Sequence, residues 1–215
     1  MSLKPDYPFG NLPRFPGIAD DLFAGRVPDD DACRKLWDKY DMFDNVRAHS
    51  RAVAAIAWDL AKMGEKKGIR INSPAVRASA LLHDLAKTYC LKYAGAHAML
   101  GASWIIRETG NYNIAQGALL HVHWPWSLPE GEAICCLPIL VLYADKRVMH
   151  DSFVSLDERF EDLFVRYGHT AKSREGIALS REQAEDIEKR LSLILGANIG
   201  DKNFFNNLAA RERTL

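Results

Sequence analysis

The stretch Leu81–Lys87 limits the possible folds of this chain more than any other. It reads Leu-Leu-His-Asp-Leu-Ala-Lys, so three polar side chains stand in an apolar run that the pattern predicts to be helical and buried. Burying a charge is costly unless the charge is paired or coordinates a metal. On a helix His83 and Asp84 diverge by about 100° and Lys87 lies one turn beyond His83. Alone, the stretch also fits an ordinary helix end with a paired His-Asp and a solvated lysine.

The rest of the chain predicts an all-α fold. Apolar residues recur with helical spacing, proline and capping residues mark several helix starts, and no segment shows the pattern of a strand. We expect the last helix to begin with a capping box of Ser180 and Gln183, and a break in the chain at about 89–94. The predicted helices cover about 29–40, 44–66, 73–84, 95–108, 112–123, 137–147, 156–167 and 181–195.

Composition divides the chain into three expected parts. Residues 1–28 are rich in proline and predict an extended arm. Residues 29–150 carry the long apolar helices and predict the helical core. Residues 151–215 predict amphipathic, charged helices that pack on this core and end in a weakly specified tail.

Charge and cysteine usage narrow the classes of partner. The chain has 28 Lys and Arg against 28 Asp and Glu, so we expect neither a nucleic-acid nor a membrane partner. The longest apolar run, 133–144, is too short to span a bilayer and contains Pro138. Four cysteines without a CxxC pair suit reduced thiols, so we expect a cytoplasmic protein, with a homodimer left open.

Six polar residues fall on mostly apolar helical segments, and together they predict a metal centre. Each of them alone is more often a satisfied core residue than a ligand. Several unrelated buried polar groups would be a poor way to build one core, whereas metal coordination explains all of them at once. Mixed imidazole and carboxylate ligands suit iron, manganese, cobalt or zinc. The six residues are His49, His83, Asp84, His97, His121 and Asp145.

In this order and spacing, the set resembles the HD superfamily of metal-dependent phosphohydrolases, over roughly 49–147. The resemblance implies an HD-domain helical bundle with extra C-terminal helices, and it is closest in look to the bacterial dinucleoside-tetraphosphate hydrolases with a di-iron centre. It therefore favours iron, with one or two divalent ions bound. It implies one metal on His49, His83, Asp84 and Asp145, and a second on His97 and His121, with Asp84 bridging. The sequence His121-Val122-His123-Trp124 departs from the family pattern, so His123 stays an alternative to His121.

The resemblance also implies the reaction. We expect hydrolysis of a phosphate ester or anhydride, with a nucleotide as the expected substrate, through a metal-bound hydroxide. Asp84 and Lys87 are the expected catalytic residues, and Lys87, Lys146 and Arg147 the expected phosphate-binding residues. Solvated positions at helix ends are the simpler interpretation of the three cations. Trp124 and Trp126 are expected either to stack on a nucleobase or to hold their loop on the core.

Two other functions fit the same residues. Di-iron oxygenases such as myo-inositol oxygenase are similar to HD proteins in fold and ligands, and would act on a small polar substrate. A non-catalytic sensor or scaffold is the second alternative, although every expected ligand is present.

Overall fold

The computed structural model describes residues 25–201 and 203–205, and their regular structure is almost entirely helical, which confirms the all-α prediction. Two short strands, β1 and β2, form an antiparallel hairpin in which Val148 pairs with Phe153. The elements are α1 (Asp30–Lys39), α2 (Asp44–Lys66), α3 (Ser73–Leu82), α4 (Lys87–Tyr93), α5 (His97–Thr109), α6 (Tyr112–Leu120), the 3₁₀ helix η3 (Gly131–Cys135), α7 (Leu137–Lys146), β1 (Val148–Met149), β2 (Ser152–Phe153), α8 (Leu156–Tyr167) and α9 (Ala171–Leu195).

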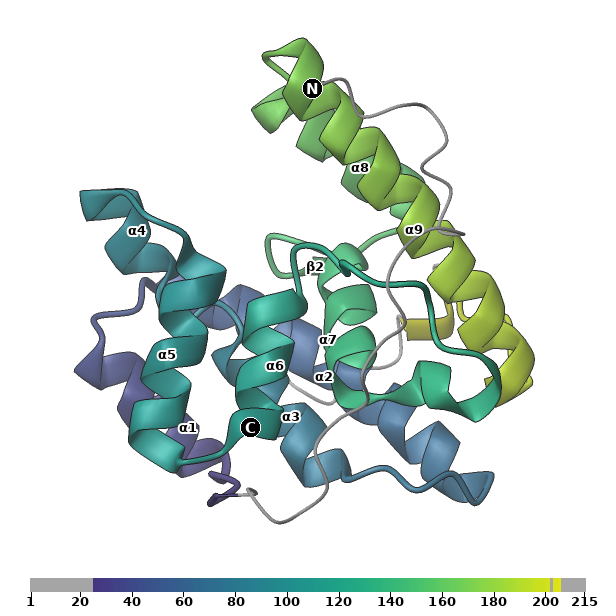
Figure 1. Cartoon of the computed structure of the whole chain (residues 1–215), viewed down its shortest axis with the longest axis horizontal. Coiled ribbons are helices and arrows are strands. Elements are labelled where there is room, and N and C mark those ends of the chain that lie inside the picture. Colours follow the sequence, from purple (N-terminus) through teal and green to yellow (C-terminus); the bar gives the residue numbers. More distant parts are fainter. Residues whose placement is uncertain (1–24, 202, 206–215) are drawn as a thin grey trace.

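The centre of the bundle is α7, which is surrounded by α2, α3 and α6 (Figure 1). Every residue of α7 is buried, as the apolar run over 137–144 predicts, and Pro138 stands in its first turn, where no backbone N–H is needed. Helix α6 also packs on α3 and α5. A Cβ at Gly117 would come within 2.0 Å of Ser79 Oγ, so a glycine is what allows this close approach of α6 to α3.

The His-Asp segment corrects the sequence prediction. Helix α3 ends at Leu82, and residues 83–86 form turns in which Leu85 N donates to Leu82 O and Lys87 N donates to Asp84 O. Helix α4 then begins at Lys87, so the region expected to be a break is largely helical. The break falls at 94–96 instead, where Ala94 has a φ of 62°. His83 and Asp84 therefore reach the interior from a turn rather than from a continuous helix.

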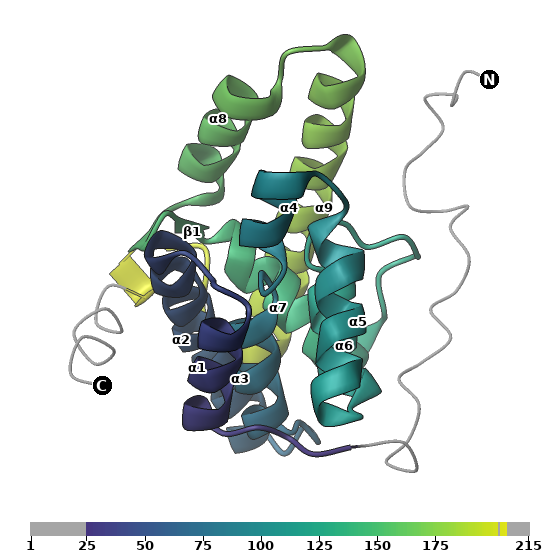
Figure 2. The same cartoon turned by 90° about the vertical axis from the view of Figure 1, so that its left-hand side faces the viewer.

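Helices α8 and α9 form a hairpin that rises beside the bundle (Figure 2). The capping box of α8 consists of Ser155 and Glu158. The predicted start of the last helix was wrong, because α9 begins at Ala171 with a capping box of Thr170 and Ser173. Ser180 lies inside this helix, where its spacing to Gln183 has no capping role.

Part of the expected domain organisation lies outside the described residues. The expected arm at 1–28 is described only from residue 25, and the expected tail lacks residues 202 and 206–215. Within 25–201 and 203–205, none of the helices has the length and apolar character needed to cross a membrane.

Candidate metal centre

All six expected ligands meet in one place, although they come from separate elements. His49 comes from the first half of α2, His83 and Asp84 from the turn after α3, and Asp145 from the end of α7. The remaining two are His97, the first residue of α5, and His121, the residue after α6. Five of them are buried, and only the His97 side chain, at 30%, is substantially exposed.

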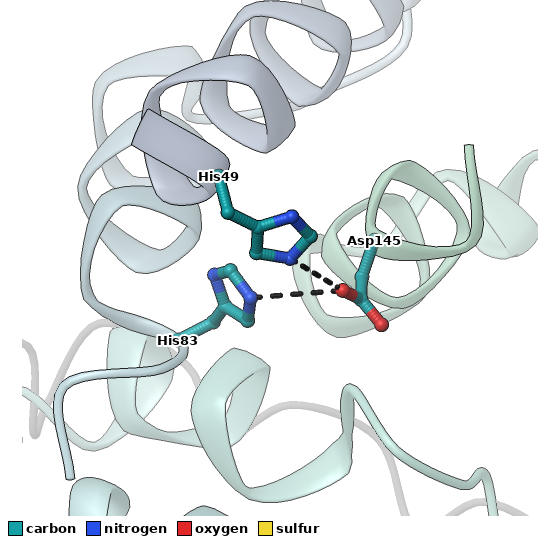
Figure 3. Close-up of side chains that lie close together, drawn as sticks. All are labelled: His49, His83 and Asp145. Carbon is teal, nitrogen blue, oxygen red and sulfur yellow. Dashed lines mark hydrogen bonds and ion pairs between the residues drawn. The ribbon is translucent and has the colours of Figure 1, made fainter. Parts of the chain in front are cut away.

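One group of ligand atoms lies around Asp145 (Figure 3). His49 Nε2 is 3.0 Å from Asp145 Oδ1, and His83 Nε2 is 3.8 Å from the same oxygen. One ligand atom from each of these three side chains lies within 4.8 Å of the others. A single ion of tetrahedral or higher coordination requires such a spacing.

Asp84 connects this group to a second one. Its Oδ2 lies 3.4 Å from His83 Nε2 and 4.0 Å from His49 Nε2. Its Oδ1 faces the other way, 3.4 Å from His97 Nε2 and 3.5 Å from His121 Nε2. The two oxygens of one carboxylate therefore face different sets of histidines, which is the arrangement that a bridging carboxylate needs.

Backbone carbonyls orient three of the imidazoles. The Nδ1 of His83 donates to Ala80 O, and the Nδ1 of His121 donates to Ala118 O, each at 2.7 Å. The Nδ1 of His49 donates to the backbone carbonyl of residue 150 at 2.8 Å. Because a carbonyl only accepts, each Nδ1 carries a proton, which leaves Nε2, the nitrogen that points towards the carboxylates, as the atom that can bind a metal. Metal-binding histidines are commonly oriented by such bonds.

Two buried atoms in this cluster lack a hydrogen-bond partner among the described residues: His83 Nε2 and Asp84 Oδ1. Both residues are fully buried, and an unpaired buried polar atom costs about 1–3 kcal/mol. Both atoms are of the kind that binds a transition metal. The residues present therefore fit a resident metal, with His49, His83, Asp84 and Asp145 suited to one ion and His97 and His121 to a second.

The charges of the site favour ionised carboxylates. Burial raises the pKa of Asp84, but the neighbouring His83 and Lys87 outweigh it and hold this pKa well below its ordinary value. Burial likewise raises the pKa of Asp145, but attraction to Lys146 and a hydrogen bond with His49 outweigh this effect. The pKa of Asp145 therefore also lies well below its ordinary value. Both carboxylates are thus in the form that binds a cation.

The histidine at the edge of the cluster stays neutral. Burial lowers the pKa of His97 to about 4 despite the attraction of Asp84. Neutral imidazole is the form that binds a metal.

Two of the three predicted phosphate-binding cations lie at the site. Lys87 Nζ is 2.6 Å from Asp84 Oδ2, and Lys146 Nζ is 2.9 Å from Asp145 Oδ2. Arg147 is placed elsewhere. Its buried guanidinium donates to carbonyl oxygens of 154, 199 and 200, to Tyr143 Oη and to Glu188 Oε2. The side chain therefore ties the end of α7 to the C-terminal elements, and the geometry does not support a role in binding phosphate.

A pocket of about 800 Å³ opens over the cluster, between the α8–α9 hairpin on one side and α4 and residues 121–123 on the other. Lys87, Lys146 and five of the six expected ligands line it; His83 lies deeper. Sequence reasoning missed Arg159 of α8, which also lines it. The signal was present, since Arg159 stands on the same helical stripe as Leu156, Phe160 and Leu163.

The tryptophan loop follows the simpler of its two interpretations. Trp124 is fully buried, and its backbone exchanges hydrogen bonds with the Gln183 side chain of α9. Trp126 packs against it with ring centroids 5.1 Å apart. Neither residue lines the pocket, whereas His123 does. Burial lowers the pKa of His123.

Comparison with known proteins agrees with this geometry. Residues 46–149 match the HD domain family. This match supports the resemblance to the HD superfamily of metal-dependent hydrolases. An uncharacterized protein of Methanocaldococcus jannaschii, MJ0778, is 26% identical over 158 residues, which cover 68% of this chain and 91% of that protein. No solved structure is a significant match to the chain. The matched HD domain contains all six expected ligands but neither α8 nor α9.

Proposed function

We propose that this chain is a metal-dependent phosphohydrolase that cleaves a phosphate ester or anhydride of a nucleotide. The observation that carries the proposal is the pair of unsatisfied buried atoms, His83 Nε2 and Asp84 Oδ1, in a cluster of oriented imidazoles beneath an open pocket. The HD domain match supports the same reaction class. A dinucleoside tetraphosphate is one candidate substrate within it.

When bound, divalent ions supply Lewis acidity that activates water and polarises a phosphoryl oxygen. Iron is our first candidate, and manganese, cobalt and zinc suit the same donors. His49, His83, Asp84 and Asp145 would hold one ion. His97 and His121 would hold a second, which Asp84 would share.

Of the two lysines at the site, Lys87 is the one that acts on the substrate. Burial lowers the pKa of Lys87, but Asp84 outweighs it and the pKa is raised, so Lys87 is a cation at neutral pH. One of its three N–H groups donates to Asp84, and its side chain, 33% exposed, lines the pocket. Its remaining donors can therefore bind phosphoryl oxygens as negative charge grows on them. Lys146 is committed to Asp145 and to the carbonyl of His121, so its main effect is to neutralise charge.

The charges around the pocket favour a phosphorylated substrate over a neutral polyol. Asp84 and Asp145 are the only carboxylates among the described residues that line it, and both belong to the metal cluster. The other charged lining residues are cations from three elements: Lys87, Lys146, Arg159 and Arg166. An oxygenase for an uncharged substrate has no need of this excess. A volume of about 800 Å³ can hold a nucleotide.

Reconstitution with different metals tests the reaction class. The full chain is stripped of metal, loaded with Mn²⁺ or Co²⁺ without oxygen, and offered nucleoside mono-, di- and triphosphates and dinucleoside tetraphosphates. We expect release of phosphate or a nucleotide, because hydrolysis needs Lewis acidity and no redox change. Activity that requires iron, consumes oxygen and yields no phosphate product would overturn the proposal in favour of the oxygenase.

A further inference from the structure

Arg159 reaches the site from α8, outside the matched HD domain, and its donors are poorly used. Its side chain is only 9% exposed, and its Nε has no hydrogen-bond partner among the described residues. One terminal nitrogen lies 3.9 Å from Asp145 Oδ1, and the other lies 3.4 Å from Asp162 Oδ2. The first distance is too long for a hydrogen bond and the second is at the long limit. A buried guanidinium with unused donors beside a pocket is suited to an anionic ligand.

Arg159 also changes the charge of the site. Lys87 and Lys146 each pair with one carboxylate, Asp84 or Asp145, and these four charges cancel. Asp162 is shared between Arg159 and Arg166 and pairs more closely with Arg166, so the two arginines leave the site with a net positive charge before any divalent ion is added. Such a site suits a terminal phosphoryl group, which is a dianion near neutral pH, better than an internal phosphodiester, which carries one negative charge.

The rest of the hairpin gives the pocket an apolar wall. Phe160 and Leu163 of α8 and Ile177 and Leu179 of α9 line it, and exposed Leu91 of α4 also lines it on the opposite side. In Figure 1 the hairpin and α4 stand on opposite sides of the bundle's upper end. This wall continues directly from Arg159, so a substrate with its phosphate at the cluster would place its organic part here.

From these contacts we propose that Arg159 binds a phosphoryl oxygen of the substrate and that the site selects a terminal phosphate carried on an apolar or aromatic group. This inference rests on the proposed function, since it narrows the substrate class of the same site, and it excludes dinucleoside tetraphosphates, whose phosphates are all internal. It predicts that the C-terminal hairpin, and not the HD domain alone, determines which phosphate compounds are accepted.

Phosphate binding tests Arg159 without requiring turnover. Calorimetric titration of the Mn²⁺-loaded full chain with inorganic phosphate would compare wild type, Arg159→Met, Arg159→Lys and Arg181→Met. Arg181 is the matched control, because it lies on the same hairpin, pairs with Asp157 and Glu185, and does not line the pocket.

We expect Arg159→Met to weaken phosphate binding about 10- to 100-fold, the range for a lost charged hydrogen bond. Arg159→Lys should recover part of the loss and Arg181→Met should show none. Metal content and unfolding midpoint should be unchanged. Equal phosphate affinity in wild type and Arg159→Met would overturn the inference and leave the proposed function standing.

Two synthetic esters test selectivity with one leaving group. We expect wild type to cleave p-nitrophenyl phosphate with a kcat/KM at least about 100-fold above that for bis-p-nitrophenyl phosphate. Arg159→Met should reduce this ratio about 10-fold or more, because one charged contact to the phosphate is lost. Ile177→Ala should raise KM for the monoester without changing the affinity for inorganic phosphate. A diester preference in wild type would overturn the substrate class. Absence of both hydrolyses, with phosphate still bound through Arg159, would count against the proposed function alone.

Discussion

The two walls of the pocket are built in opposite ways. On the core wall, formed by the metal cluster, imidazoles are fixed by backbone carbonyls and carboxylates are held by lysines, so that few atoms can move. On the hairpin wall, formed by α8 and α9, apolar side chains stand beside two arginines, and Arg159 keeps a donor that no described residue uses. The difference indicates that the core wall holds the metal-binding and catalytic groups in place, whereas the hairpin wall recognises the substrate.

The same contrast separates two buried arginines. Among the described residues, Arg147 donates to five acceptors, whereas Arg159 has only long contacts to two carboxylates. A saturated guanidinium holds the fold together, and an unsaturated one beside a pocket is available to a ligand. Burial alone would not have distinguished them, since both are buried.

Loss of the carboxylate at the centre of the core wall should have the largest effect. Asp84→Ala removes an atom pair that faces both groups of histidines, and leaves Lys87 without its partner. We expect metal content to fall to background and turnover to fall by about 10³-fold or more, because the metal supplies the reactive chemistry.

Metal analysis of protein purified without chelator, together with rates on the best substrate, measures both effects. Asp157→Ala is the control, since Asp157 is an exposed carboxylate that pairs with Arg181 on the outside of the hairpin. Full metal content and full activity in Asp84→Ala would show that the centre has been placed wrongly.

The next largest effect, on the free energy of unfolding, is expected from replacing Arg147 and not from replacing Arg159. Arg147→Met removes a buried cation and its hydrogen bonds to Tyr143, Glu188 and three carbonyls. We expect the free energy of unfolding to fall by about 3–5 kcal/mol in urea titrations, the usual cost of breaking a buried pair. Arg159→Met should change it by less than about 1 kcal/mol, because its contacts are long. A reversed order of the two variants would remove the distinction between structural and ligand-binding arginines.

His97 tests whether the core wall holds two ions. It is the most exposed of the six ligands, and within the described part of the chain its Nε2 faces Asp84 Oδ1 and His121 Nε2 alone. His97→Ala should therefore halve the metal content under saturating Fe²⁺ or Mn²⁺ and spare the ion at His49 and Asp145. Metal analysis of wild type under the same conditions is the control. One ion per chain in wild type would make His97 a substrate-side residue instead.

Lys87 belongs to the core wall, where it pairs with Asp84, and its removal should separate binding of metal from catalysis. Lys87→Ala should lower the rate by about 10- to 100-fold while leaving most of the metal bound, because the ammonium compensates phosphoryl charge rather than coordinating the ion. Parallel measurements of kcat and metal content check this. Equal losses of both would instead assign Lys87 to the support of Asp84.

The sequence predicted the components of the site better than their local geometry. Helical periodicity and capping residues placed α2, α7 and α8 almost to the residue, because these helices have one clear face or are apolar throughout. The end of α3 was misplaced, because Leu85 and Ala86 continue the apolar spacing of the helix and no glycine or proline marks the turns at 83–86. The start of α9 was misplaced because a serine-glutamine spacing occurs inside helices as well as at their ends.

Partners distant in the sequence could not be predicted. That Arg147 is saturated depends on Ile199 and Gly200, more than fifty residues later in the chain. That Arg159 reaches Asp145 depends on the β1–β2 hairpin, which redirects the chain after α7. Periodicity reveals which residues are buried, whereas the identity of their contacts comes from the tertiary fold.

The smallest effect is expected far from both walls, at Glu108 near the other end of α5 from His97. Hydrogen bonds from Lys39, above all, and from Tyr40 lower its pKa from 4.5 to about 2. The group is more acidic when folded, so its contribution to stability is fully present above about pH 4.5 and is lost as the pH falls towards 2. Because the cluster is at the surface, Glu108→Gln should cost only about 0.5–1 kcal/mol at pH 7.

Urea unfolding of wild type and Glu108→Gln at pH 7, 5 and 3.5 measures this contribution directly. The difference between the two proteins should be equal at pH 7 and 5 and smaller at pH 3.5, because only the wild-type residue titrates in that range. Metal content and phosphate affinity at pH 7 should not change, since Glu108 belongs to neither wall. A change in either quantity would show that α5 transmits structure from its far end to His97, and the core wall would then extend beyond the residues that surround the cluster.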